Sequence, residues 1–173
     1  MKRTASTYIG IAVLAIFGLG GLTGGTVAIQ MVDNSLQEQK ITFGADTAYA
    51  GQHVNNGLDA YRFQKVIAGH VTAALKPLGV STYEQASALS RASATAANPA
   101  GDPKLAAARR TALDGNLLRG TLFSSFAWWM VGWVGVAAGF AFLLLAGLAY
   151  RITRKDSTLY FPVHEEVKRP VVV

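Results

Sequence analysis

Two long stretches without a charged residue constrain this sequence more than any other feature. Residues 8–32 and residues 120–150 contain no Asp, Glu, Lys, Arg or His. The continuous apolar run of the second stretch, residues 126–150, is 25 residues long, as is the first stretch. An α-helix of that length reaches about 37 Å, more than the roughly 30 Å hydrocarbon core of a bilayer. A chain of 173 residues is too short to bury two such helices in a soluble core. The sequence therefore predicts two membrane-spanning helices.

The first stretch has a second interpretation, which is a cleaved signal peptide. Lys2 and Arg3 precede the apolar run, and the small residues Thr26 and Ala28 near its end would permit cleavage. The run is, however, longer than the roughly 7–15 apolar residues of a signal-peptide core. We therefore favour a retained helix.

Basic residues gather at the two ends of the chain. Residues 1–7 and 151–173 together hold seven Lys or Arg and three acidic residues, whereas residues 33–119 hold nine and seven. Basic residues accumulate on the cytoplasmic side of spanning helices. The pattern predicts a cell-membrane protein with both ends in the cytoplasm and residues 33–119 outside. It also argues against nucleic acid as a partner. The topology-setting residues are Lys2, Arg3, Arg151, Arg154 and Lys155.

Aromatic residues at the ends of the two stretches agree with this orientation. Tryptophan and tyrosine are enriched at membrane–water interfaces, where they contact lipid headgroups. The predicted anchors are Tyr8 and Tyr150 at the inner surface and Trp128, Trp129 and Trp133 at the outer surface. The Trp pair at 128–129 could also bind a lipid, a quinone or a partner helix together with Phe123 and Phe126, but an interfacial belt is favoured.

Glycines at helical spacing predict faces that pack against another helix. Small residues four apart let two helix backbones approach closely and gain dispersion contacts that lipid does not supply. Gly21 and Gly25 repeat this spacing in the first stretch. The pattern does not decide whether the faces meet each other or a larger membrane subunit. The helix-packing candidates are Gly20, Gly24 and Ala28 in the first stretch and Gly132, Gly135 and Gly139 in the second.

Residues 33–119 predict a small helical domain with a thin core. Apolar side chains recur at spacings of three and four over residues 58–75, and Pro77 and Gly79 end that helix. Ser81 and Glu84 form a capping-box pattern that opens a second helix to about residue 97. Asp102 and Pro103 begin a third helix, which we expect to continue into the second apolar stretch.

The whole chain is accordingly predicted to be an all-α membrane protein, with two transmembrane helices bracketing a small helical extracytoplasmic domain. Residues 41–43 are expected to form a short strand or an extended segment. The predicted segments are residues 1–7, a cytoplasmic N-terminus, 8–32 and 120–150, the transmembrane helices, 33–119, the domain, and 151–173, a cytoplasmic tail that is extended from residue 156 on.

Few side chains in this sequence can support catalysis or metal binding. There is no cysteine, which excludes disulfides, thiolate nucleophiles and covalently attached haem. His53, His70 and His164 have no acidic or histidine partner at ligand spacing. Ser81, His70 and Asp59 could supply a hydrolytic triad, but no nucleophile-elbow pattern surrounds the serine. We expect no catalytic residue, cofactor or metal.

Three short motifs resemble a known family. They are Gln-Lys-Ile-Thr at residues 39–42, Tyr-Ala-Gly-Gln-His-Val at 49–54 and Leu-Arg-Gly-Thr-Leu-Phe at 118–123. Over most of residues 8–150 the chain resembles a family of small actinobacterial membrane proteins in which two membrane helices bracket a short outer domain. Some members are labelled ring-opening dioxygenases. The two-histidine, one-carboxylate iron site of such oxygenases has no counterpart at suitable spacing here.

Small two-helix proteins of this kind are also similar to accessory subunits of the actinobacterial respiratory supercomplex of cytochrome bcc and cytochrome aa3 oxidase. The likeness implies a non-catalytic subunit that docks on larger integral membrane subunits through its glycine-lined faces. Two alternatives remain open at the level of sequence. One is a stand-alone extracytoplasmic binding or sensing module, and the other is a membrane-anchored enzyme that uses His53 or His70.

Overall fold

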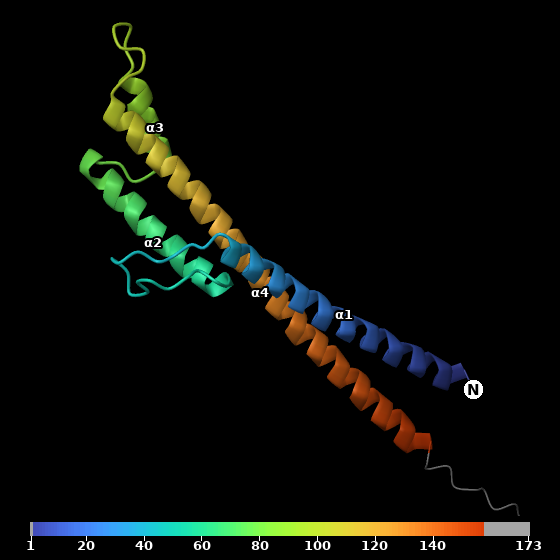
Figure 1. Ribbon diagram of the computed structural model, residues 1–173. Coiled ribbons are helices and arrows are strands. Elements are labelled where there is room, and N and C mark those ends of the chain that lie inside the picture. The colour runs from blue at the N-terminus through green and yellow to red at the C-terminus, as the bar shows by residue number, and fades with distance from the viewer. Residues whose placement is uncertain (1, 158–173) are drawn as a thin grey trace, which may run out of the picture. The chain divides into compact units, whose positions relative to one another are not determined.

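The computed structural model describes residues 2–157 of the chain and the side chains of residues 5–154. It contains the helices α1 (Lys2–Glu38), α2 (Gly57–Leu75), α3 (Tyr83–Ala92) and α4 (Pro103–Ser157), and the short 3₁₀ turn η1 (Lys76–Leu78) (Figure 1). The predicted all-α fold, with two long apolar helices bracketing a shorter helical region, is confirmed. Both α1 and α4 contain stretches long and apolar enough to cross a membrane, Ala5–Glu38 and Pro103–Arg154. The tail was predicted to be extended from residue 156 on, but α4 continues through Ser157; from residue 158 on the predicted tail, including His164, lies outside the described residues.

The described chain forms two compact units. The first comprises Met1–Leu22 and Ala137–Val173, and we name it the helix-pair unit. The second comprises Thr23–Val136 and contains the ends of α1 and α4 together with α2 and α3. We name it the central unit, and the two are described separately below.

Helix α2 begins and ends close to the predicted positions. The Asn56 side chain caps its first turn by accepting a hydrogen bond from the Asp59 backbone N–H at 3.0 Å. After Leu75 the chain tightens into η1, and Gly79 ends it with φ 68°, a left-handed conformation that glycine adopts without a steric penalty.

Helix α3 differs from the prediction at both ends. Thr82, not Ser81, is the cap, and its Oγ1 accepts the Gln85 N–H at 3.2 Å. The Gln85 side chain in turn accepts the Ser81 N–H at 2.9 Å, so Gln85 takes the place that was assigned to Glu84. The helix ends at Ala92 instead of residue 97, because the Ser93 hydroxyl accepts the Asp102 N–H at 2.8 Å and turns the chain toward α4.

Helix α4 runs without interruption for 55 residues. The Asp102 carboxylate accepts the Lys104 N–H at 2.8 Å, and Pro103 occupies the first helical position, as predicted. At about 1.5 Å per residue the helix reaches about 82 Å. The boundary between residues 119 and 120 is therefore a change in side-chain polarity and not a break in the backbone.

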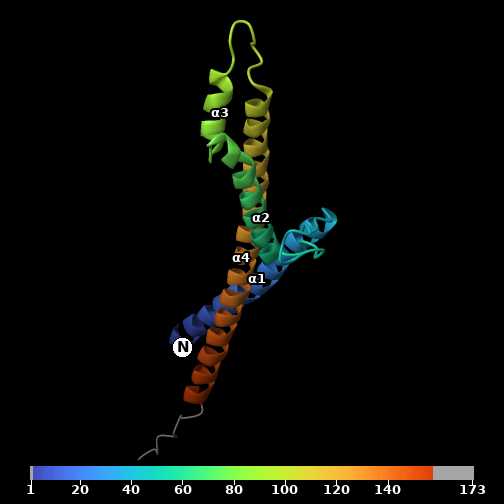
Figure 2. The same cartoon turned by 90° about the vertical axis from the view of Figure 1, so that its left-hand side faces the viewer.

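Two small clusters of buried side chains hold the central unit together. The first joins α2, α3 and the beginning of α4, and α3 lies beside α4 in both views (Figures 1 and 2). Its members on α4 are alanines, which let the helices approach closely but bury little apolar surface. The cluster consists of Val71, Leu75, Val80, Ala86, Ala108 and Ala112.

The second cluster fixes the loop between α1 and α2. Phe43 donates its N–H to the Gln52 carbonyl and Val54 donates to Ile41, both at 2.9 Å. Only one isolated bridge, between Thr42 and His53, has strand geometry in this loop, where a short strand or an extended segment was expected. The buried side chains are Leu36, Phe43, Val54, Ala60 and Leu122.

We predict that Leu75→Ala destabilises the central unit by about 2–5 kcal/mol, because Leu75 is fully buried and its removal leaves a cavity. Thermal unfolding in mild detergent, followed by circular dichroism, measures the change. Leu89→Ala is the matched control, because Leu89 is 41% exposed. Equal destabilisation by both substitutions would contradict the placement of the core.

Candidate functional site

In the central unit, α1 and α4 pack backbone against backbone at two glycines. A Cβ atom built on Gly25 would lie 2.5 Å from the Gly132 carbonyl oxygen and 2.7 Å from the Val136 nitrogen. A Cβ on Gly132 would lie 2.7 Å from the Ile29 side chain and 2.9 Å from the Gly25 carbonyl oxygen. Because Ile29 meets Gly132 while Gly25 meets Val136, the two helices run antiparallel here. No side chain larger than hydrogen fits at either glycine without a shift.

The helix-pair unit contains a second contact of the same kind. A Cβ on Gly139 would lie 2.5 Å from the Leu22 nitrogen, and one on Gly18 would lie 3.0 Å from the Gly139 carbonyl oxygen. Gly18 and Gly25 are seven residues apart in α1, as are Gly132 and Gly139 in α4.

The predicted glycine candidates divide between two sides of the helices. Gly132 and Gly139 are buried in the contacts above, and Ala28 and Gly135 are half-buried. Gly20 and Gly24 are exposed, and a Cβ at either position would meet nothing within 4 Å. These two do not belong to the contact within the chain. Gly18, which the four-residue spacing did not single out, takes part in it instead.

The interfacial and topology residues are placed as follows. Tyr8, Trp128, Trp133 and Tyr150 are 46–62% exposed. Trp129 is half-buried, and its ring packs on the backbone of Gly57 at the start of α2, where a Cβ would collide with it. Arg151 and Arg154 are exposed on the last turns of α4, whereas the side chains of Lys2, Arg3 and Lys155 lie outside the described set.

A polar group of α1, the Asp33 carboxyl, also lies beside the Trp129 ring and Gly57. The Asp33 carboxyl faces the Gly57 N–H and the Trp129 indole N–H. Asp33 Oδ1 and Trp129 Nε1 are both buried and form no hydrogen bond of good geometry. Elements far apart in sequence, α1, α2 and α4, therefore meet at Asp33, Gly57 and Trp129, a junction that the sequence pattern did not reveal.

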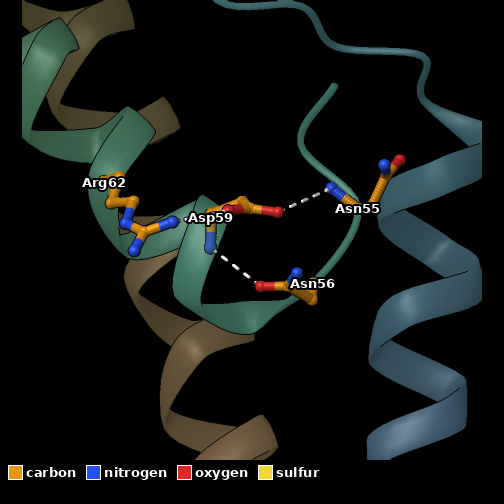
Figure 3. Close-up of polar contacts among 4 residues, drawn as sticks. All are labelled: Asn55, Asn56, Asp59 and Arg62. Carbon is orange, nitrogen blue, oxygen red and sulfur yellow. Dashed lines mark hydrogen bonds and ion pairs between the residues drawn. The ribbon is translucent and has the colours of Figure 1, made fainter. Parts of the chain in front are cut away.

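The first turns of α2 form an ordered polar corner (Figure 3). The Asp59 carboxylate accepts hydrogen bonds from the Asn55 N–H at 3.4 Å and from Arg62 Nη1 at 3.2 Å. The Asp59 N–H is held by Asn56. Asp59 thus pairs with Arg62 and leaves little net charge at this corner.

Beyond this corner, α2 presents cations and aromatic rings to α4 and to the loop. Lys65 Nζ lies 4.3 Å from the centre of the Tyr61 ring, which stacks on Phe126 at 4.7 Å. The Arg62 guanidinium lies 5.0 Å from the centre of the Tyr49 ring. Two cavities of about 490 and 500 Å³ adjoin Tyr61, one lined by Arg62 and Lys65 and the other by Arg119.

The histidines and the hydrolytic candidates are dispersed. His70 Nε2 lies 2.6 Å from Asp46 Oδ2, an acidic partner that sequence spacing did not reveal, and both side chains are exposed. His53 Nδ1 bonds the Thr42 hydroxyl at 3.1 Å. Asp59 is paired with Arg62 near the start of α2, and Ser81 bonds Gln85. The triad considered from sequence is therefore not assembled, and no group of three metal-binding side chains occurs among residues 2–157.

Comparisons with protein families, curated proteins and solved structures find no match to this chain. The resemblance carried by residues 39–42, 49–54 and 118–123 therefore stays a prediction.

We predict that Gly25→Leu destabilises the chain by about 3 kcal/mol or more, since its side chain would collide with the backbone of α4. Gly24→Leu, one residue away, places the same side chain in open space and should leave stability unchanged or raise it. Thermal unfolding in mild detergent compares the two. Equal melting temperatures for both variants would refute the contact.

A second prediction concerns the pair of Asp46 and His70. The hydrogen bond from His70 lowers the pKa of Asp46 below its usual 3.8. A lowered pKa means that the ionised carboxylate stabilises the fold above about pH 4, and that this contribution disappears as the pH falls through the lowered value. Asp46→Asn should therefore lower the melting temperature slightly at pH 6 and by less at pH 2.5.

The His70→Ala variant tests whether the pair is responsible. In that background Asp46→Asn should have no further effect at pH 6. A difference between the parent chain and Asp46→Asn that is as large at pH 2.5 as at pH 6 would contradict the assignment.

Proposed function

We propose that this chain is a non-catalytic accessory subunit of a larger membrane complex. In this proposal α1 and α4 cross the cell membrane, both termini are cytoplasmic, and the connecting domain (residues 33–119) docks on a partner outside the membrane. The apolar composition and length of α1 and α4 support the crossings. The basic residues at both chain ends support the orientation.

One observation carries the proposal, an apolar row on α4 that nothing in the described chain covers. Leu113 is 40% exposed and Leu117 is 61% exposed. They lie one turn apart on the side of α4 away from Ala108 and Ala112, which face α2 and α3. Both precede the uncharged stretch, so lipid tails do not cover them in this orientation. Large apolar side chains exposed to water in a row are typical of a protein interface.

The charges beside this row fit a polar rim around an apolar contact. Arg110 lies 3.8 Å from Asp114 on the same helix, and both are largely exposed. A cavity of about 690 Å³ is lined by these two side chains with Leu113 and Ala106. An apolar centre with a polar, exposed rim is the usual anatomy of a docking surface.

The partner we propose is a large integral membrane assembly, and the similarity noted from sequence names the cytochrome bcc–aa3 supercomplex. Its haems would make it recognisable by absorbance in purified material. The exposed face of α1 that carries Gly24, where a bulky side chain meets no other part of the described chain, is the proposed contact within the membrane.

We predict that the double substitution Leu113→Glu with Leu117→Glu lowers recovery of the partner at least tenfold when the tagged chain is purified from its own membranes in mild detergent. Two carboxylates at the centre of an apolar contact would be buried without partners, which costs several kcal/mol. Mass spectrometry and haem absorbance measure the recovered subunits.

Leu89→Glu is the matched control, because Leu89 on α3 has the same exposure as Leu113. It should leave recovery unchanged. The proposal fails if the chain is purified without any other membrane subunit, or if the double variant retains the partner as well as the control does.

A further inference from the structure

A cavity between α2 and α4 has the chemistry of an anion site at its polar end. Its volume is about 500 Å³, and it is lined by Tyr61, Gln64, Asn116, Arg119, Gly120 and Phe123. The guanidinium of arginine offers a planar set of N–H donors that matches phosphate oxygens in bidentate pairs. Two amides and a phenol beside it supply further donors.

One buried polar atom of this cavity lacks a partner in the described chain. Arg119 Nε is buried and makes no hydrogen bond, and Arg119 forms no ion pair with any acidic residue described here. Gln64 is only 9% exposed, and its side chain lines the same cavity. Buried polar groups are normally satisfied, so Arg119 Nε indicates a missing ligand.

The charge around the cavity is positive. The nearest carboxylate on α2, Asp59, is already paired with Arg62 at 3.2 Å. Lys65 lies over the Tyr61 ring and has no acidic partner within the described residues. Arg119 therefore brings an uncompensated charge to this cavity, and Lys65 brings a second one to the neighbouring cavity on the other side of Tyr61; both favour an anion.

The position of the cavity along α4 favours a lipid over a soluble anion. Arg119 is the last charged residue before the uncharged stretch of residues 120–150. Thirty-one helical residues span about 46 Å, close to the roughly 40–45 Å thickness of a bilayer with its headgroups. Arg119 and Phe123 thus lie at headgroup level. The cavity is polar at Arg119 and aromatic at Phe123, as an amphiphilic ligand requires.

We propose that this cavity binds the phosphate of an anionic glycerophospholipid, held by Arg119, Gln64 and Asn116, with the lipid chains leaving along Phe123. The proposal rests on the membrane placement of α4 and not on the role as an accessory subunit. Bound lipid would satisfy the unpartnered Arg119 Nε and join α2 to α4 at the membrane surface.

The test uses the full chain, purified alone in mild detergent, and native mass spectrometry of its complexes with phosphatidylglycerol and with phosphatidylcholine of the same acyl chains. The parent chain should retain phosphatidylglycerol at least fivefold better, because choline adds a positive charge beside Arg119. Arg119→Gln should abolish this preference. Arg109→Gln, an equal loss of charge about 15 Å farther along α4, should preserve it.

Two further arms separate the alternatives. Gln64→Glu places a carboxylate in the cavity where it can pair with Arg119, so the variant is expected to fold, as its helical circular dichroism will show, and to lose the preference for phosphatidylglycerol. Inorganic phosphate at 100-fold molar excess should not displace the bound lipid. The proposal is overturned if Arg119→Gln and Arg109→Gln weaken lipid retention equally, if both lipids bind alike, or if inorganic phosphate displaces phosphatidylglycerol.

Discussion

The direct contact between the backbones of α1 and α4 is the interaction on which the rest of the structure depends. At Gly25 and Gly132 in the central unit, and at Gly18 and Gly139 in the helix-pair unit, there is no room for a side chain. Between two helices in lipid there is little hydrophobic driving force, so close dispersion contacts must hold them together. Glycine permits this close approach but has a low helix propensity. Packing of the surrounding apolar residues offsets the resulting loss of helix stability.

The same pairing positions the connecting domain. Leu36 near the end of α1 and Leu122 on α4 belong to the same buried cluster as three residues of the loop and α2. The loop and α2 therefore pack against both long helices; their residues in the cluster are Phe43, Val54 and Ala60. The domain's other cluster contains three alanines, which bury little surface. A domain with so thin a core gains much of its stability from the long helices beneath it. This dependence agrees with a subunit whose domain acts at the membrane surface rather than alone.

Local sequence patterns predicted most of the helices, but they could not predict contacts between residues far apart in the sequence. Asp102 and Pro103 marked the beginning of α4 because capping depends on neighbouring residues only. The sequence of α1 alone does not predict which of its glycines face α4. Three overlapping rows of glycine lie on this helix, and contact with α4 determines which row is buried. Four-residue spacing selected Gly20 with Gly24 and also Gly21 with Gly25, whereas the contact uses Gly18 and Gly25, seven residues apart. A search for seven-residue spacing in both helices would have found it.

The candidate site shows the same limit. The sequence predicts Trp129 as an interfacial anchor, and the structure adds that its ring packs on Gly57, which lies 72 residues earlier. The cavity at Arg119 also depends on Gln64 of α2, and neither residue stands out in the sequence. What the sequence did indicate is that Arg119 is the last charged residue before the uncharged stretch of residues 120–150. The charge pattern therefore predicts where a membrane surface would lie along α4, and only the structure shows that Gln64 of α2 lines a cavity with Arg119.

The pairing of α1 with α4 is tested most directly by cross-linking of introduced cysteines, because the chain has no cysteine of its own. Phe17→Cys combined with Phe142→Cys should be joined by a short bifunctional thiol reagent in native membranes, since the centres of the two rings lie 6.3 Å apart. Phe17→Cys combined with Phe140→Cys should not be joined, because Phe140 is 58% exposed on another side of α4. Equal cross-linking of the two pairs, or none in the first, would contradict the account.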